Sequence, residues 1–165
     1  MSLYPADIEV AAAGVIAGFT ARKLTVATAE SCTGGLIIGA LTEIAGSSAV
    51  VDRGFITYSN QAKIDLLGVS AETLAHHGAV SRPTAIEMVN GALQRSRCDV
   101  AVAVTGIAGP GGGSDEKPVG LVHVAARRHD GTVLHREMCY GDLGRSGIRL
   151  ATVRTALEML GELAR

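Results

Sequence analysis

Two side chains have the types needed for chemistry with a nucleophile and a base. Ser31 follows a short apolar run, in the segment Glu-Ser-Cys-Thr-Gly-Gly, and Lys63 is one of only three lysines among 15 basic residues. A buried lysine can lose its proton whereas an arginine stays charged, so Lys63 is suited to accept the proton of a serine hydroxyl. Each residue also has a plainer interpretation, Ser31 as a helix N-cap and Lys63 as a solvated surface lysine.

Two neighbouring residues offer alternatives to this pair. Cys32 is a second candidate nucleophile, although its small apolar surroundings are more typical of a buried structural thiol. Ser59 stands four residues before Lys63, so it would share a helix face with the lysine and could be its partner. Ser31 lies at an expected strand-to-helix turn, where unpaired backbone N–H groups suit a developing oxyanion. Ser59 lies outside this turn, and this favours Ser31.

A glycine-rich segment at residues 105–120, TGIAGPGGGSDEKPVG, follows the third expected strand. It lacks the Gly-Lys-Ser/Thr of a nucleotide-triphosphatase phosphate loop, and Ser114 stands where the third glycine of Gly-x-Gly-x-x-Gly would fall. The segment is therefore either a flexible connection or a backbone-lined wall or lid over a ligand.

The histidines and cysteines do not form a metal-binding pattern. The three cysteines are widely spaced and make no Cys-x-x-Cys, which argues against a zinc site or a disulfide framework. A hairpin centred on Asp130-Gly131 pairs His135 with Ala126, which predicts that His123 and His135 point to opposite sides of the sheet. We expect a mechanism that uses no metal and no cofactor.

The pattern of apolar residues predicts the elements that must position these side chains. Helices are expected over 6–21, 33–44, 60–67, 70–76, 81–97 and 145–164, and strands over 24–29, 50–58, 99–104, 119–127 and 132–139. This order predicts an α/β fold, a three-layer α/β/α sandwich with a mixed sheet of about five strands. Right-handed crossovers would make the first three strands parallel, so their polar carboxyl ends should meet at one edge and form a single pocket.

The composition limits the kinds of protein this can be. The 165 residues carry 15 basic and 16 acidic side chains; 47% are hydrophobic and 3% aromatic. A near-neutral chain with few aromatics lacks the charge and stacking surface of a nucleic-acid binder. No apolar run reaches the ~20 residues that cross a bilayer, and no basic leader precedes the first one. We expect one cytoplasmic domain over 1–165, with no nucleic-acid or membrane partner.

Five motifs together resemble the C-terminal domain of the competence/damage-inducible protein CinA family. They are AESCTGG (29–35), GSSAVVDRGFITYSNQAKIDLLGV (46–69), HGAVS (77–81), AVTGIAGPGGG (103–113) and EKPVG (116–120), and they span nearly the whole chain. Stand-alone members are similar to nicotinamide-nucleotide amidohydrolases, which convert nicotinamide mononucleotide (NMN) to nicotinate mononucleotide and ammonia in pyridine-nucleotide recycling. The resemblance implies this activity, a three-layer fold with one antiparallel strand, and a homo-oligomer.

The resemblance also implies roles for individual residues. Ser31 would be the nucleophile and Lys63 its base, and Tyr58 and Thr105 would complete the catalytic group. Backbone N–H groups from Ser31 to Thr33, with Thr105, would stabilise the oxyanion. The expected substrate-binding residues, with Arg145 or a helix N-terminus on the phosphate, are Thr33, Gly34, Gly106, Gly109, Gly111, Gly112 and Arg145.

Two positions depart from the family pattern. The family often has Gly-Asp-Arg before the last helix, whereas this chain has Gly-Asp-Leu-Gly-Arg at 141–145, so Arg145 matches only across a short insertion. Arg53 replaces a residue that is usually small. Neither departure affects Ser31 or Lys63.

A second class of function stays open at this point. A non-catalytic nucleotide-binding or regulatory module, linked to competence or the DNA-damage response, would use the same pocket and glycine-rich segment. Such a module does not need Ser31 and Lys63 together, so their joint presence favours the enzyme. The composition disfavours a role on DNA.

Overall fold

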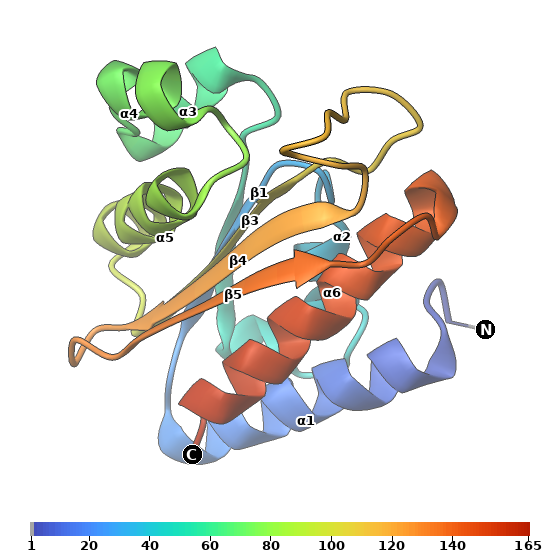
Figure 1. Cartoon of the computed structure of the whole chain (residues 1–165). Coiled ribbons are helices and arrows are strands. Elements are labelled where there is room, and N and C mark those ends of the chain that lie inside the picture. The colour runs from blue at the N-terminus through green and yellow to red at the C-terminus, as the bar shows by residue number, and fades with distance from the viewer. Residues whose placement is uncertain (1) are drawn as a thin grey trace.

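A mixed five-stranded sheet forms the centre of the computed structural model, which describes residues 2–165 (Figure 1). The strands are β1 (Val26–Glu30), β2 (Val51–Ile56), β3 (Val100–Gly106), β4 (Leu121–Arg128) and β5 (Val133–Cys139). Their order across the sheet is β2-β1-β3-β4-β5. β1 is parallel to β2 and β3, and β4 is antiparallel to both β3 and β5, so β4 alone runs against the other four.

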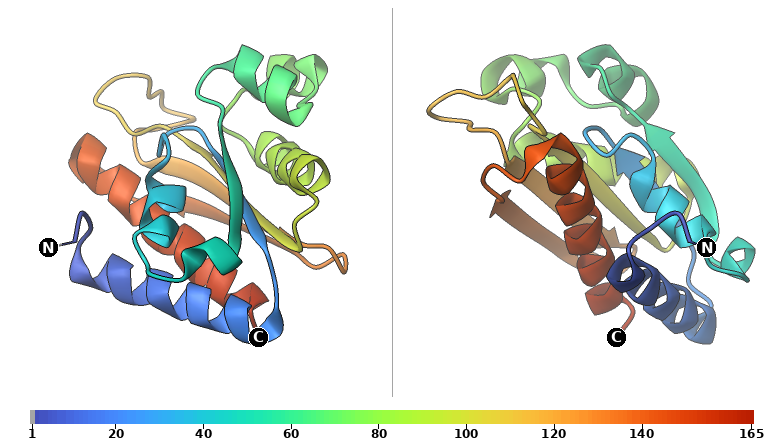
Figure 2. Two further views of the ribbon diagram at one scale, coloured as in Figure 1. Left: turned by 180° about the vertical axis from the view of Figure 1, so that it is seen from behind. Right: turned by 90° about the vertical axis from the view of Figure 1, so that its right-hand side faces the viewer.

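Helices cover both faces of the sheet. They are α1 (Ala6–Arg22), α2 (Leu36–Thr42), the 3-10 helix η1 (Ser47–Ala49), α3 (Asn60–Leu67), α4 (Ala71–His77), α5 (Arg82–Ser96) and α6 (Gly144–Leu163). α1, α2 and α6 lie on one face, and α3, α4 and α5 lie on the other (Figures 1 and 2). The three-layer sandwich predicted from the sequence is confirmed. In the described part of the chain, residues 2–165, no helix combines the length and the apolar character that crossing a membrane requires.

β3 shows how the sheet divides the core. Val102 and Val104 point into the core shared with α1 and α6, whereas Ala101 and Ala103 point toward α5. Alternate residues of a strand point to opposite faces, so the continuously apolar sequence of β3 fits its place at the centre, buried on both sides. The small alanines let α5 lie close to the sheet.

The helix expected over 33–44 is shorter than predicted. α2 begins at Leu36, and Gly34 and Gly35 before it have φ angles of +57° and +104°, which favour glycine. The N-cap residue of α2 is Gly35, so the interpretation of Ser31 as an N-cap is wrong. The Ser31 hydroxyl is thereby left for another partner.

α2 packs inside the molecule. Ile37 and Leu41 on this helix are fully buried, and the Tyr4 hydroxyl donates a hydrogen bond to the backbone oxygen of Leu36. The sequence left open whether this apolar helix contacts its own domain or a second subunit, and its buried face contacts its own domain.

The β4–β5 hairpin has a register one residue away from the predicted one. His135 pairs with Ala125 rather than Ala126, because three residues, 129–131, form the turn instead of two. Ala125 lies two residues from His123, so both histidines share one face, with His123 Nδ1 3.0 Å from His135 Nε2. The prediction that they point to opposite sides is therefore wrong.

Candidate active site

The three parallel strands end at one edge of the sheet, as their order along the chain predicts. β1 leads directly into Ser31, β2 is followed by Thr57 and Tyr58, and β3 ends at Gly106. A cavity of about 260 Å³ lies at this edge. Its lining residues come from segments far apart in the sequence: Ser31, Cys32, Tyr58, Lys63, Ala79, Val80, residues 105–109, Gly111, Gly112 and Arg145.

Ser31 and Lys63 meet in this cavity. Lys63 Nζ lies 3.0 Å from Ser31 Oγ, and the lysine reaches it from α3. The lysine is only 1% exposed, and its Nζ also donates to the backbone oxygens of Thr57, at 2.9 Å, and Tyr58, at 3.3 Å. The amine is therefore within hydrogen-bond distance of the serine proton.

The surroundings of Lys63 destabilise its charged form. Burial lowers its pKa from 10.5 to about 8, because the charged amine loses its hydration. A neutral amine has two hydrogens and one lone pair. The two backbone oxygens accept the hydrogens, so the lone pair is left for the Ser31 hydroxyl. This is the arrangement that a serine nucleophile and its base require.

The alternative partners are placed differently. The Ser59 hydroxyl is the N-cap of α3 and accepts the backbone N–H of Ala62 at 3.0 Å, so Lys63 pairs with Ser31 and not with Ser59. Burial raises the pKa of Cys32 to about 11, so its thiol stays protonated at neutral pH. A protonated thiol is a poor nucleophile, which leaves Ser31 as the candidate.

Glu30, for which the sequence predicted no role, stabilises the turn that contains Ser31. Its side chain is fully buried and accepts five hydrogen bonds. The donors are Thr28 Oγ1 (3.2 Å), Thr33 Oγ1 (2.6 Å) and the backbone N–H groups of Gly35 (3.0 Å), Ile37 (3.0 Å) and Ile38 (2.9 Å). A carboxylate at the start of a helix satisfies N–H groups that the helix itself cannot pair. The signal in the sequence was an acidic residue directly after an apolar strand.

The backbone N–H groups available to an oxyanion are fewer than expected. Ser31 N–H donates to Val104 O at 3.1 Å, and the Thr105 hydroxyl donates to Ala79 O at 2.8 Å. The N–H groups of Cys32 and Thr33 have no acceptor within residues 2–165. Of the expected donors, those that stay free therefore belong to the two residues that directly follow Ser31.

Arg145 lies at the mouth of the cavity in spite of the insertion before it. Its Nη2 donates to the Tyr58 hydroxyl at 2.9 Å, and its Nη1 donates to Gly109 O at 2.8 Å. A guanidinium has five N–H donors, so three stay available, and the Tyr58 hydroxyl keeps its own hydrogen. None of the described lining residues is acidic, so the cavity suits an anionic ligand.

The other expected binding residues divide into two groups. Gly106, Gly109, Gly111 and Gly112 line the cavity with Arg145. Thr33 and Gly34 are not among the lining residues, and they belong to the turn that directly follows Ser31. The departure at position 53 is remote from the site, since Arg53 is paired with its neighbour Asp52 on the exposed edge strand β2. Over residues 2–165, no three His, Cys, Asp or Glu side chains are grouped to hold a metal ion.

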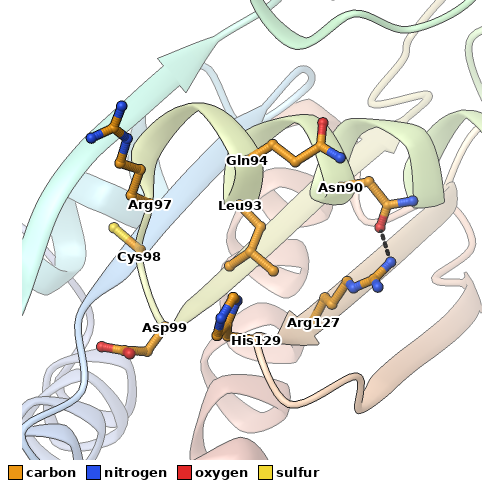
Figure 3. A pocket seen from close by; sticks show the side chains of 8 residues that line it. All are labelled: Asn90, Leu93, Gln94, Arg97, Cys98, Asp99, Arg127 and His129. Carbon is orange, nitrogen blue, oxygen red and sulfur yellow. Dashed lines mark hydrogen bonds between the residues drawn. The ribbon is translucent and has the colours of Figure 1, made fainter.

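A second and larger cavity, of about 640 Å³, lies at the opposite end of β3 (Figure 3). Its lining residues are Asn90, Leu93, Gln94, Arg97, Cys98, Asp99, Arg127 and His129. Arg127 Nη1 donates a hydrogen bond to Asn90 Oδ1 at 2.6 Å, and Asp99 accepts hydrogen bonds from the backbone N–H and the hydroxyl of Thr25. This cavity contains no serine beside a lysine, so the smaller one is the candidate for hydrolysis.

The fold and the site together define an α/β protein with a serine–lysine pair beneath a glycine-rich segment. The family model for the CinA C-terminal domain matches residues 8–164. This chain belongs to the CinA C-terminal domain family.

Relatives within the family have two kinds of name. The nicotinamide-nucleotide amidohydrolase PncC of Escherichia coli (strain K12) is 52% identical over 141 residues, which are 85% of this chain and 84% of that protein. A CinA-like protein of Chlorobaculum tepidum is 52% identical over 149 residues, which are 86% of this chain but 35% of that longer protein.

Solved structures agree with the fold. The crystal structure of the competence/damage inducible protein CihA from Agrobacterium tumefaciens is 69% identical, has a TM-score of 0.99, and is matched over 100% of both chains. The competence damage-inducible protein A from Klebsiella pneumoniae is 39% identical with a TM-score of 0.89, over 94% of this chain and 95% of that one. The chain therefore shares both the family and its three-layer architecture.

Proposed function

We propose that this protein hydrolyses the carboxamide of NMN to nicotinate mononucleotide and ammonia, with Ser31 as nucleophile and Lys63 as base. The observation that carries the proposal is the 3.0 Å contact between Lys63 Nζ and Ser31 Oγ, with the lysine buried and its pKa lowered to about 8. The E. coli relative with 52% identity is named for amide hydrolysis of a nicotinamide nucleotide.

The first half of the reaction forms an ester on the enzyme. Neutral Lys63 takes the proton of Ser31, the serine oxygen bonds to the carboxamide carbon, and the carbonyl electron pair moves onto its oxygen. The free N–H groups of Cys32 and Thr33 stabilise that oxyanion. The C–N bond then breaks, and the leaving nitrogen takes the proton from the Lys63 ammonium and departs as ammonia.

The second half regenerates the serine. Lys63, neutral again, accepts a proton from water, whose oxygen attacks the ester carbon. The bond to Ser31 breaks and the serine oxygen recovers its proton from Lys63. The product forms as the carboxylic acid, which loses its proton to solvent and leaves as the carboxylate. One amine therefore serves each proton transfer, and the backbone oxygens of Thr57 and Tyr58 stabilise it while it is charged.

The nucleotide's phosphate fits the mouth of the cavity. We assign it to the free N–H groups of Arg145, with the Tyr58 hydroxyl beside them. Gly106, Gly109, Gly111 and Gly112 form a wall without side chains that lets the ligand approach the backbone. Thr105 lines the same wall and holds residue 79 through its hydroxyl, so we keep it as a site residue but not as an oxyanion donor.

A non-catalytic nucleotide-binding module is the second candidate, and several relatives have competence/damage-inducible names. Such a module would use the cavity and Arg145 in the same way. It has no need of a lysine buried against a serine, an arrangement that costs stability because the charge is desolvated. The geometry at Ser31 therefore favours the enzyme.

The test is the release of ammonia from NMN by the purified protein without added metal. Ser31→Ala should lower the rate at least ~10³-fold because the nucleophile is lost, while NMN binding by calorimetry stays within about threefold. Ser59→Ala is the matched control, because it removes a nearby serine hydroxyl that only caps α3. Turnover by Ser31→Ala at the wild-type rate would contradict the proposal, and NMN binding without turnover by the wild-type protein would favour the module.

The remaining expectations from the sequence belong to the same proposal. We propose that residues 1–165 act as one domain in the cytoplasm, as a homo-oligomer, on a small nucleotide and not on nucleic acid. Light scattering measures the assembly, cell fractionation the location, and a salt-dependent DNA retention assay the last point. A monomer, or DNA binding that weakens with salt, would contradict the corresponding part.

A further inference from the structure

α6 carries two arginines one helical turn apart, and they hold two different walls of the cavity. Arg145 contacts Tyr58 and Gly109 at the mouth. Arg149 reaches the turn after β1, where its Nε donates to Cys32 O and its Nη2 donates to Thr33 O, both at 3.0 Å. Residues four apart on a helix lie on the same side, so one face of α6 is joined to both walls.

The contacts of Arg149 fix the peptide groups that follow the nucleophile. A trans peptide is planar, so its C=O and N–H point in opposite directions. The bond from Arg149 to Cys32 O therefore sets the direction of the Thr33 N–H. The neighbouring peptide is fixed in the same manner, because Ser31 O accepts the Gly34 N–H at 3.1 Å and so directs the Cys32 N–H.

Within the described residues 2–165, neither of these two directed N–H groups has an acceptor, although both belong to buried residues. Buried backbone N–H groups are almost always paired, so two unpaired ones beside Ser31 indicate donors kept for a bound group. Other polar groups of the same turn are paired, since the Thr33 hydroxyl and the Gly35 N–H both donate to the Glu30 carboxylate.

We propose that Arg149 is a positioning residue for amide hydrolysis: its bond to Cys32 O directs the Thr33 N–H, and its bond to Thr33 O holds the Gly34 N–H that in turn directs the Cys32 N–H. The inference rests on the proposed function. Arg149 is not among the residues that line the cavity, so it acts through the turn and not on the substrate. An arginine suits this task because its planar fork presents two N–H donors at fixed spacing, which a lysine cannot do.

The decisive measurement is the kinetics of Arg149→Gln and Arg149→Lys with NMN. A misdirected oxyanion donor weakens only the transition state, so kcat should fall about 10–100-fold in the glutamine variant while KM changes less than about threefold. The lysine variant can hold one carbonyl, so it should recover part of the rate. The pH midpoint of kcat, which reports Lys63, should not move.

Arg154→Gln provides the matched control. It removes a guanidinium from the same helix, where Arg154 pairs with Asp7 of α1 far from the turn. Its kcat should stay within about twofold of wild type, since surface ion pairs contribute little. Binding is measured separately, by calorimetry with NMN on a Ser31→Ala background, where adding Arg149→Gln should leave the affinity unchanged.

Three results would overturn the inference. The first is a kcat within threefold of wild type in Arg149→Gln, and the second is a loss confined to KM or to NMN affinity. The third is an equal loss in the glutamine and lysine variants together with a large fall in melting temperature, which would mean that Arg149 only holds the fold. If wild type releases no ammonia, or Ser31→Ala keeps its activity, the proposed function fails instead.

Discussion

Lys63 and Glu30 are two buried ionisable side chains beside Ser31, and their surroundings differ: Glu30 precedes the serine in the chain, whereas Lys63 contacts it from α3. Glu30 accepts five hydrogen bonds, three of them from the backbone at the start of α2. Lys63 has two backbone oxygens and one hydroxyl, with the apolar protein interior around them. Both groups are removed from water. The two oxygens of the Glu30 carboxylate each accept at least two hydrogen bonds, whereas Lys63 Nζ has only three neutral partners.

This difference in hydrogen bonding separates a side chain that stabilises the structure from one that can take part in the reaction. A buried carboxylate with every lone-pair direction used stabilises the turn and has nothing left to offer a ligand. A lysine whose charged form is poorly solvated has its pKa lowered to about 8, so it can exchange a proton near neutral pH. The nucleophile thus lies between one group that holds its backbone and another that takes its proton.

The largest effect should come from removing the amine. Lys63→Met keeps the volume and the apolar contacts but leaves Ser31 without a base, so kcat should fall about 10³-fold or more. The free energy of unfolding in urea at pH 7 should stay within about 1 kcal/mol of wild type or rise, because a costly buried charge is gone. A stability loss of several kcal/mol would show that Lys63 is structural, like Glu30.

Replacing the carboxylate should have the opposite profile. Glu30→Gln introduces an amide NH₂ where an oxygen accepted hydrogen bonds, leaving backbone donors of Gly35 or Ile38 unpaired. The free energy of unfolding should fall by about 3 kcal/mol, with a melting temperature about 6–12 °C lower. Calorimetric and urea unfolding measure this change. If Glu30→Gln were as stable as wild type, Glu30 would not be the structural group that distinguishes it from Lys63.

The proton affinity of Lys63 should set the pH dependence of the reaction. The lysine is the base only when neutral, and with a pKa lowered to about 8 most molecules carry the extra proton at pH 6. The rate should therefore rise about 50-fold from pH 6 to pH 8 and level off above pH 9. Initial rates of ammonia release measured from pH 6 to pH 9 test whether the rate rises with pH. A rate independent of pH would exclude a lysine base with this pKa.

The smallest expected effects are changes in the free energy of unfolding when two fully buried threonines, one beside Glu30 and one beside Lys63, are replaced. The Thr33 hydroxyl donates to Glu30 at 2.6 Å, whereas the Thr57 hydroxyl, next to Lys63, has no partner in the described residues 2–165. Thr33→Val should lower the free energy of unfolding by about 1–2 kcal/mol, and Thr57→Val should leave it unchanged or slightly raised. Urea unfolding of the two matched variants measures the difference. Equal costs would mean that both hydroxyls have partners in solution.

Several features of the fold followed from local patterns. The strand expected over 99–104 and the helix expected over 81–97 depend on neighbours in the sequence, and the structure has them as β3 and α5 at about the predicted places. The meeting of three strand ends followed from the handedness of crossovers, which needs only the order of elements. Ser31 and Lys63 could be paired as candidates because their types complement each other.

Other features depended on atoms that the sequence does not place. The hairpin register turned on one extra residue in the turn at 129–131, which moved His135 to the face of His123. Ser59 and Ser31 matched Lys63 equally by type, and the sequence favoured Ser31 only through its place in the turn. The contact itself depends on α3 directing the amine toward Ser31 while the Ser59 hydroxyl caps that helix. Arg149 was visible only as an arginine four residues after Arg145, and its partners come from the turn after β1, more than 100 residues earlier in the chain.

The sequence by itself determined which groups are present: a hydroxyl, an amine with an adjustable proton affinity, a chain of glycines and an order of elements that brings strand ends together. Only the tertiary structure decided what each group does. Proton affinity depends on lost hydration, and a backbone N–H is free or used according to what faces it. Both are properties of the packed surroundings, to which residues distant in the chain contribute as much as neighbours.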